Sequence, residues 1–237
     1  MGNYLPIDQK KADRQRPCGK DELIERVSED RMSTLSLSEK AFQAKRNQIL
    51  RGAEAVFLDL GYEGASMSRI AQYAAVSKGT LYNHFKDKKD LFREIILSIS
   101  KNKLSGLFRY EEHFDGACET CLVAICEEFV TAITHPISLG IYRIVVSEAP
   151  KFPEISEIMQ EYAINPTRSC IRSALIYWCK KQTLQVEDMD QAERVFISLC
   201  MSGIVERRRL CVPVDSSAEA ISRHGREVVR IFMKIYS

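Results

Sequence analysis

The sequence has no apolar run long enough to cross a lipid bilayer. A membrane-spanning helix needs about 18 or more consecutive apolar residues, and no such run occurs here. The stretch from Met1 to Arg16 is polar and mixed in charge, without the apolar core and small-residue cleavage site of a secretory signal. Internal repeats and low-complexity segments are also absent. We therefore expect a cytoplasmic protein that has no membrane partner.

The sequence also lacks the short motifs by which many enzymes are recognised. It has no glycine-rich phosphate loop, no Gly-x-Ser-x-Gly and no His-Glu-x-x-His. The four histidines are scattered along the chain, at His84, His113, His135 and His224. We therefore expect no enzyme activity, no cofactor and no metal site, and an enzyme that uses the C-terminal part of the chain is the weaker hypothesis.

Positive charge is scarce outside one segment. The formal net charge is only +2. Residues 38–101 hold 11 basic and 7 acidic side chains, whereas residues 102–237 hold 16 and 18. This local excess suggests a polyanion partner for residues 38–101 alone. A non-specific architectural DNA binder would be strongly basic overall, so the acidic balance after residue 101 argues against that function.

The remaining sequence is a series of helical patterns with almost no two-residue alternation, which predicts an all-α fold. The first strong pattern runs from Ser38 to Leu60, with Gly61 as a stop, and Ser36 and Glu39 have capping-box spacing at its start. Its apolar positions are Phe42, Ile49, Ala53, Val56, Phe57 and Leu60.

Two short helices are predicted next, over 67–74 and 78–84, each preceded by a serine cap, Ser66 or Ser77. A further helix begins after Asp87, another predicted cap. Later apolar-periodic segments lie near 117–134, 137–148, 153–163, 167–182, 189–206 and 217–235. Prolines 136, 150, 153, 166 and 213 separate most of them.

The second short helix has two different faces. Leu81 and Phe85 are four residues apart and should be buried together against Ile70, Ala71 and Ala74 of the first short helix. The exposed face is then Lys78, Thr80, Tyr82, Asn83 and His84. Two short helices of this kind form a helix-turn-helix, whose second helix enters the major groove of DNA.

Each polar residue type suggests a different contact with DNA. Thr80, Asn83 and His84 suit base edges. The residues suited to phosphates are Ser66, Ser68, Lys78, Tyr82 and Lys86. Gly79 leaves room for close approach of a phosphate. Lys86, Lys88 and Lys89 surround a helix N-terminus, which also favours phosphate. The alternative interpretation is an ordinary solvated face on a small helical hairpin.

The runs from Ser68 to Ala71 and from Val76 to Lys88 resemble the signature of the TetR/AcrR regulators, and the likeness extends over about residues 40–100. The resemblance implies an Ω-shaped homodimer that binds a palindromic double-stranded DNA operator and releases it when a small-molecule effector occupies the C-terminal domain. Carried over by position, it turns Thr80, Tyr82, Asn83 and His84 toward DNA and places Lys86 on a phosphate.

The helical patterns and the resemblance together predict a domain organisation, in which the N-terminal extension is longer than such a regulator usually needs. We predict an N-terminal extension at 1–37, a helix-turn-helix domain at 38–86 and a helical ligand-binding and dimerisation domain at 87–237. One residue departs from the family pattern, because Ala75 occupies the turn position where glycine is usual. We therefore expect a strained or reshaped turn, since a positive φ at alanine costs about 1–2 kcal/mol.

The C-terminal part gives fewer signals. Residues 142–154 resemble the C-terminal domain of a subset of these regulators, and the last two apolar segments suit a four-helix dimer seam. The predicted seam residues are Val195, Phe196, Leu199, Cys200, Ile204, Val228, Val229, Phe232 and Met233. The alternative is that they form the core of a single chain. Arg207, Arg208 and Arg209 are interpreted as a solvated helix end.

Aromatic and amphipathic residues inside a helical domain are candidates for lining a ligand cavity. Those singled out are His135, Tyr142, Arg143, Tyr177 and Trp178. The competing interpretation of each is a core or surface residue with satisfied partners.

The eight cysteines fall mostly within apolar helical patterns, which favours small buried side chains in a reducing compartment. They are Cys18, Cys118, Cys121, Cys126, Cys170, Cys179, Cys200 and Cys211. An alternative function is a thiol-based metal- or redox-responsive regulator that uses Cys118, Cys121 and Cys126, although no histidine cluster completes a tetrahedral site.

Overall fold

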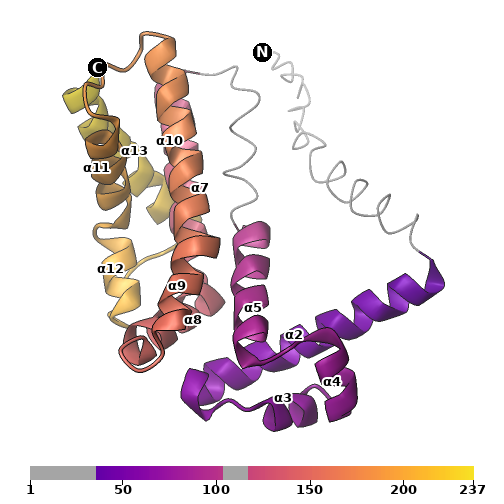
Figure 1. Ribbon diagram of the computed structural model, residues 1–237. Helices are drawn as coiled ribbons and strands as arrows, with labels where there is room; N and C mark the ends of the chain where they lie inside the picture. Colours follow the sequence, from indigo (N-terminus) through magenta and orange to yellow (C-terminus); the bar gives the residue numbers. More distant parts are fainter. Residues whose placement is uncertain (1–35, 104–116) are drawn as a thin grey trace, which may run out of the picture. The chain divides into compact units, whose positions relative to one another are not determined.

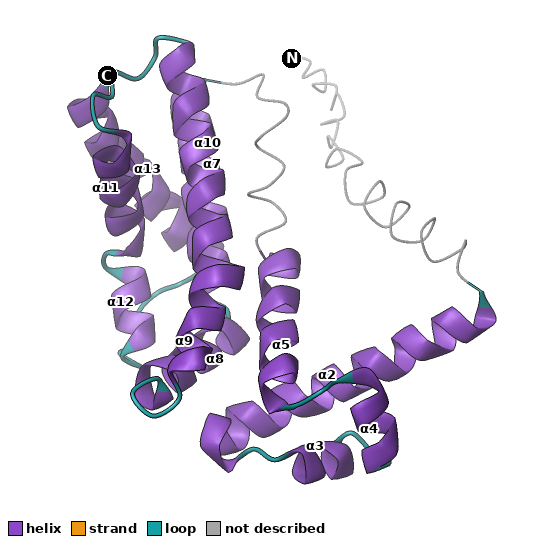
Figure 2. Ribbon diagram, viewed as in Figure 1, coloured by secondary structure: helices purple, strands orange, loops and turns teal. Residues whose placement is uncertain are grey.

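The computed structural model describes residues 36–103 and 117–237 (Figure 1). Throughout these ranges the regular elements are helices, and Figure 2 shows no strand among them. The predicted all-α fold is confirmed. Most of the predicted extension at 1–37 lies outside the described residues, as do Cys18 and His113. The described residues divide into two units, residues 36–45 and residues 46–237.

Helix α2 (Leu37–Gly64) begins with the predicted capping box. The amide of Ser36 donates to Glu39 Oε2 at 2.7 Å, and the amide of Glu39 donates to Ser36 Oγ at 3.2 Å. The predicted stop at Gly61 is an interruption instead of an end, because Gly61 has φ 72° and ψ 179° and one further helical turn follows it. Two of the predicted apolar positions are exposed, Phe42 by 49% and Leu60 by 38%.

Three more helices follow in the order that the sequence predicts: α3 (Met67–Tyr73), α4 (Lys78–His84) and α5 (Lys88–Lys103). Ser66 and Ser77 accept hydrogen bonds at the starts of α3 and α4 from the amides of Arg69 and Thr80. The amide of Asp90 donates to Asp87 Oδ1 at 2.7 Å, as a cap of α5. All three predicted caps are confirmed.

The remaining described helices are α7 (Cys118–Thr134), α8 (Pro136–Glu148), α9 (Pro153–Met159), η2 (Gln160–Ile164), α10 (Asn165–Lys180), α11 (Met189–Met201), α12 (Ile204–Arg209) and α13 (Ala218–Tyr236). Helices α7, α10, α11 and α13 run alongside one another (Figure 1), with the most extensive contact between α7 and α13.

Two predicted boundaries are wrong. Pro166 does not separate helices, because α9 continues through the π-helical turn η2 into α10, where Pro166 lies in the first turn. The wider π turn accommodates a residue that has no amide hydrogen to donate. The segment predicted as one helix over 189–206 is broken at Ser202 and Gly203, which has φ 67°.

The buried residues form two apolar cores. The first combines α2, α3, α4 and α5 with residues of α8 and α9, among them Phe57, Phe92, Ile141 and Ile155. It therefore joins residues on both sides of the predicted domain boundary at 86 and 87. The second core combines α7 and α10 to α13.

Most residues of the predicted dimer seam belong to the second core of this one chain. Phe196, Cys200, Ile204, Val228, Val229 and Phe232 are buried there, and Val195, Leu199 and Met233 pack against it. They are covered because α7 packs along α13, which itself contacts α11. The alternative of core packing within one chain therefore describes these side chains.

Within the described ranges, no single helix is both long and apolar enough to cross a membrane. Helices α7 and α8 meet that length and composition only as a pair, which is bent by 65°.

Candidate nucleic-acid interface and ligand cavity

Helix α4 has the two faces that the sequence predicts. Leu81 and Phe85 are 0% and 1% exposed, whereas Tyr82 is 54% exposed. Lys78, Gly79 and Asn83 are exposed with Tyr82. A helix this short is held by its buried side chains and its cap, so the exposed side chains contribute little to its stability. They are available for contact with a partner.

Two residues of the predicted DNA-contacting face are less exposed than the others. Thr80 is half-buried, and its hydroxyl is hydrogen bonded to Ser77 Oγ at 2.8 Å. His84 is half-buried beside Phe85, with ring centroids 6.4 Å apart. The expectation that Thr80 and His84 are exposed is therefore wrong. His84 lies at the end of α4, where the backbone turns extended at Phe85 and draws the chain toward the core.

Helix α2 fixes the positions of α3 and α4. Gln48 Nε2 donates to Ala74 O at 2.7 Å, and the guanidinium of Arg46 lies 4.9 Å from the Phe85 ring centre. A Cβ atom on Gly52 would lie 2.7 Å from Ala74 Cβ, so only glycine permits this approach of α3 to α2. Ala75 has φ 51°, which confirms the strained turn expected there.

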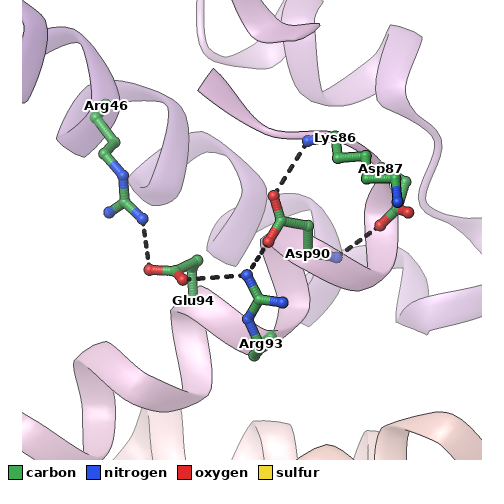
Figure 3. Close-up of polar contacts among 6 residues, drawn as sticks. All are labelled: Arg46, Lys86, Asp87, Asp90, Arg93 and Glu94. Carbon is green, nitrogen blue, oxygen red and sulfur yellow. Dashed lines mark hydrogen bonds and ion pairs between the residues drawn. The ribbon is translucent and has the colours of Figure 1, made fainter. Parts of the chain in front are cut away.

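Carboxylates, and not open amides, occupy the N-terminus of α5 (Figure 3). The amide of Lys86 donates to Asp90 Oδ2 at 3.1 Å, and Asp90 is also paired with Arg93. A phosphate at this helix start would lie beside the capping carboxylates of Asp87 and Asp90, so the predicted contact depends on the neighbouring lysine side chains. The side chain of Lys86 is exposed and stays a candidate for phosphate contact.

The same network joins α5 to α2 through an ion pair of Arg46 with Glu94, which also pairs with Arg93 (Figure 3). Burial raises the pKa of Glu94, but the hydrogen bonds and charges of the two arginines outweigh burial, so the pKa lies below its ordinary value. Glu94 is therefore ionised at neutral pH and secures the α2–α5 packing beneath α4.

Lys88 is directed toward Tyr62. Its Nζ donates to Tyr62 O at 2.7 Å and lies 4.3 Å from the centre of the Tyr62 ring. Burial lowers the pKa of Lys88, and the charges of nearby Glu148, Glu154 and Glu63 oppose the shift. Of the three lysines predicted around this helix end, Lys86 and Lys89 are exposed and Lys88 is not.

The structure adds two exposed residues on α3 that the sequence analysis did not single out. Arg69 is exposed and its guanidinium donates to Gly64 O at 3.3 Å, while Tyr73 is 66% exposed. Ser66 and Ser68 are exposed at the start of the same helix. Arg69 lies inside the run that carries the resemblance, and its charge was a signal that could have identified it.

A second group of contacts joins α8 to the chain just after Gly61. The carboxylate of Glu148 accepts the amide of Tyr62 at 2.9 Å and that of Glu63 at 2.6 Å. A Cβ atom on Gly61 would lie 2.2 Å from Glu148 Oε1. We call Gly61, Tyr62, Glu63 and Glu148 the Glu148 clasp. Lys151 also pairs with Glu63.

Aromatic rings pack beside the Glu148 clasp. Tyr62 is stacked on Phe57 at 5.8 Å and makes edge contacts with Phe92 and Phe152 at 5.2 Å and 5.3 Å. Burial is the main reason that the pKa of Tyr62 is raised to about 12, followed by the charge of Glu154. The hydrogen bonds of the Glu148 clasp therefore lie beside the apolar contacts that Tyr62 makes with Phe152, in the turn between α8 and α9, and with the first core.

A cavity of about 600 Å³ lies among α5, α7, α8, α9, η2, α10, α11 and α12. More than half of its lining residues are apolar, such as Ile96, Phe129 and Met201. Its size and lining are those of small-molecule sites. Of the five residues predicted to line a ligand cavity, Tyr142 lines this one.

The other four predicted ligand residues have structural contacts elsewhere. His135 caps α8, with Nδ1 accepting from the amide of Ile137 at 3.4 Å. Arg143 donates to Arg208 O at 2.7 Å and Arg209 O at 3.2 Å, and so closes the end of α12. The rings of Tyr177 and Trp178 pack edge to face at 5.1 Å, with Trp178 buried in the second core.

The interpretation of the three arginines as a solvated helix end is wrong for Arg209. Its guanidinium lies 4.0 Å from the centre of the Tyr142 ring and lines the cavity. Burial lowers the pKa of Arg209, and Tyr142 opposes the shift. Arg207 is exposed, as predicted, and its guanidinium donates to Pro213 O at 3.1 Å.

The three cysteines of the thiol-sensor alternative, Cys118, Cys121 and Cys126, are buried side chains of α7. Within the described ranges, no group of three or more His, Cys, Asp or Glu side chains is arranged to hold a metal ion, and this includes Cys118, Cys121 and Cys126. Burial raises the pKa of Cys118 to about 11 and that of Cys121 to about 12. These thiols are protonated at neutral pH, and the thiolate is the reactive form.

Two family models match the sequence. One, described as bacterial regulatory proteins of the tetR family, covers residues 49–95. The other, described as the C-terminal domain of AefR-like transcriptional repressors, covers residues 120–237. Together they cover more than half of the chain, and they include α3, α4 and most of the cavity wall.

Individual proteins agree with these matches. The chain is similar to the HTH-type transcriptional regulator UidR of Escherichia coli K12, with 31% identity over 121 residues, which are 50% of this chain and 58% of UidR. The fold is similar to that of a TetR-family regulator from Mesorhizobium loti, with TM-score 0.71, 22% identity and coverage of 83% of this chain and 98% of that one. The flavonoid-responsive regulator FrrA gives TM-score 0.68 at 22% identity, covering 82% and 98%.

Proposed function

The chain belongs to the TetR family of transcription regulators, which are not enzymes, and we propose that it is a dimeric repressor that binds an operator and is released from it by a small-molecule effector. Such a protein acts on cytoplasmic DNA. Repression follows the family description of the C-terminal match. We assign DNA binding to residues 38–86 and effector binding and dimerisation to residues 87–237.

The observation that carries this proposal is the division of α4 into two faces. Leu81 and Phe85 are buried, while Lys78, Tyr82 and Asn83 are exposed one helical turn or less away. A solvated surface helix gains nothing from an exposed tyrosine, whereas a helix in the major groove uses such groups for contact. The geometry therefore favours the DNA interface over an ordinary solvated hairpin.

The residues divide by their chemistry into two groups. We propose that Asn83 reads a base edge, with Thr80 and His84 as partly buried neighbours at the groove. The proposed phosphate contacts are Ser66, Ser68, Lys78, Tyr82 and Lys86, to which the exposed position of Arg69 adds one more. A Cβ atom on Gly79 would meet only Ser77 Oγ, at 3.8 Å, so the chain leaves that side open for close approach of DNA.

A dimer follows from the way such helices read DNA. One α4 helix covers only a few base pairs, and two copies related by a two-fold axis read the half-sites of a palindrome about 34–36 Å apart. The residues first predicted for the seam are mostly occupied within the chain, so we propose that the two copies meet through the outer faces of the C-terminal helices.

The proposed route from effector to DNA uses two helices that line the cavity and also pack in the first core. Helix α5 contributes Ile96 and Ile99 to the cavity and Phe92 to the first core. Helix α8 contributes Tyr142 and Val145 to the cavity, and Glu148 to the Glu148 clasp one turn later. A ligand that moves either helix would displace α3 and α4. The name of FrrA, a regulator that responds to flavonoids, supports a small-molecule effector.

Selection of bound duplexes from random DNA by the full-length protein tests the proposal. We expect a palindrome whose half-sites are separated by about one helical turn, bound with an affinity that falls steeply as salt rises. Recovery of duplexes without symmetry or shared sequence would contradict specific binding by a dimer.

A further inference from the structure

The charged residues that line the cavity are all of one sign. Among the described lining residues there are three arginines, Arg168, Arg194 and Arg209, and no Asp or Glu. An apolar cavity gains nothing from cationic walls unless something anionic is bound there, because an unpaired charge in an apolar environment is costly. The ion pairing and the exposure of each arginine therefore indicate where an anion would bind.

Two of these arginines are already neutralised or solvated. Arg168 Nε is paired with Glu193 Oε1 at 2.6 Å, and that carboxylate is buried. Arg194 is exposed, so water and salt screen its charge. Neither is suited to bind the acidic group of a ligand tightly.

Arg209 is in a different state. It is partly buried, its guanidinium covers the Tyr142 ring at 4.0 Å, and no described carboxylate forms an ion pair with it. Guanidinium has five donors in a planar fork, which matches the two oxygens of a carboxylate. One planar face of the guanidinium packs on the Tyr142 ring. The N–H groups at its edge can then donate to a ligand.

A second polar group lines the cavity from the same helix as Tyr142. Ser138 lines the cavity four residues before Tyr142 on α8, so the two side chains share one helix face. Ser138 Oγ is buried and has no hydrogen-bond partner among the described residues. A buried hydroxyl without a partner is uncommon, and a ligand oxygen beside Arg209 would supply one. We call Ser138, Tyr142 and Arg209 the polar corner.

We propose that the cavity binds an amphipathic carboxylate, with its acid group in the polar corner between Arg209 and Ser138 and its apolar body along the rest of the cavity. This assignment rests on the proposed function, because it names the chemical class of the effector. A flexible alkyl chain and a flat aromatic ring system share this chemistry, and matched probes distinguish them.

The test is calorimetric titration of the full-length protein with decanoate and 1-nonanol, and with 2-naphthoate and 2-naphthol. Within each pair the apolar body is the same and only the acid group differs. We expect at least one carboxylate to bind wild-type protein about tenfold or more tightly than its alcohol, since a charged hydrogen-bonded pair is lost in the alcohol. The pair that shows the preference identifies the shape of the body.

Variants locate the acid group. Arg209→Gln should remove the preference for the carboxylate and leave the alcohol affinity within about threefold, while Ser138→Ala should weaken the carboxylate about fivefold. Arg207→Gln is the matched control, because Arg207 is exposed on the same helix, and it should change nothing. Circular dichroism and the alcohol affinity report whether each variant is folded.

The proposal is overturned if no carboxylate binds, if the alcohols bind as tightly as the acids, or if Arg209→Gln keeps the preference. None of these results changes the outcome of the DNA selection, which tests the proposed function separately. Conversely, a carboxylate that binds through Arg209 without weakening operator binding would support the ligand class and contradict effector release.

Discussion

The polar contacts of the helix-turn-helix and those of the Glu148 clasp differ in the sequence separation of the residues that they join. In α3 and α4 each cap joins residues three positions apart, as Ser77 Oγ does with the amide of Thr80. In the clasp, Glu148 accepts the amides of Tyr62 and Glu63 across separations of 86 and 85 residues. The surface proposed to read DNA is thus encoded locally, whereas the junction that would control it depends on the tertiary fold.

This difference gives the two regions different sensitivities. The exposed face of α4 can change without loss of the fold, because its buried face and its cap hold the helix. The Glu148 clasp cannot change without altering how α8 meets the first core. The substitutions below separate these effects and run from the largest expected change to the smallest.

The largest effect should come from the buried face of α4. Leu81→Ala removes a side chain that is 0% exposed, and we expect the free energy of unfolding to fall by about 2–5 kcal/mol because a cavity is left in the first core. Tyr82→Ala on the exposed face should change it by no more than about 0.5 kcal/mol. Urea unfolding followed by circular dichroism measures both. Equal losses would show that the two faces are not distinct.

Gly61→Ala should cause the next largest loss in the free energy of unfolding. Gly61 has φ 72° and ψ 179°, a region that essentially only glycine adopts, so alanine should lower the free energy of unfolding by about 1–3 kcal/mol. Its Cβ would also displace the carboxylate of Glu148. Hydrogen exchange at the amides of Tyr62 and Glu63 should accelerate.

Gly203→Ala is the matched control for Gly61→Ala. Gly203 has φ 67°, but a Cβ atom there meets nothing within 4 Å. It therefore reports backbone strain without a steric clash. If Gly203→Ala costs as much as Gly61→Ala and also accelerates exchange at Tyr62, the effect does not arise from the Glu148 clasp.

Ala75→Gly should stabilise the helix-turn-helix slightly. Alanine at φ 51° is strained by about 1–2 kcal/mol, and glycine relieves the strain but gains about 0.4–1 kcal/mol of entropy in the unfolded chain. The net gain in the free energy of unfolding should be about 0.5–1 kcal/mol, measured as a higher urea midpoint. A lower midpoint would mean that the Ala75 methyl makes a stabilising contact.

The buried thiols should react most slowly of all. With pKa values of about 11 and 12, Cys118 and Cys121 are almost entirely protonated at pH 7.5. We expect iodoacetamide to alkylate exposed Cys211 first and to reach the other two only in denaturant, as peptide mass spectrometry would show. For a protected thiol below its pKa, the thiolate fraction rises about tenfold per pH unit. Labelling of Cys118 at the rate of Cys211 would restore the thiol-sensor alternative.

The locally encoded features could be predicted from the sequence. The helix limits of α3 and α4, the caps Ser66, Ser77 and Asp87, and the burial of Leu81 and Phe85 all follow from spacing and residue type. The positive φ at Ala75 followed from the resemblance. The caps join residues three positions apart, and the buried positions recur at helical spacing, so a sequence pattern records both.

The features that were missed depend on distant neighbours. Lys88 is directed to Tyr62 and away from solvent, and Arg209 to Tyr142, across 26 and 67 positions of the sequence. Arg143 was predicted in the cavity but bonds the carbonyls of Arg208 and Arg209. A single sequence shows that these side chains are amphipathic, yet it does not show which helix each one meets.

The most direct measurement is the affinity for the selected operator, by fluorescence anisotropy over a range of salt, of wild-type protein and of Tyr82→Ala, Lys86→Ala and Lys101→Ala. Lys101 is exposed on α5 and serves as the control for loss of a surface charge. If α4 and the turn after it hold the DNA, the first two variants bind about fivefold to tenfold more weakly, and Lys86→Ala lowers the salt slope by about 1, while Lys101→Ala binds as wild type. Equal affinity and equal salt slopes in all four proteins would contradict the claim that this surface binds DNA.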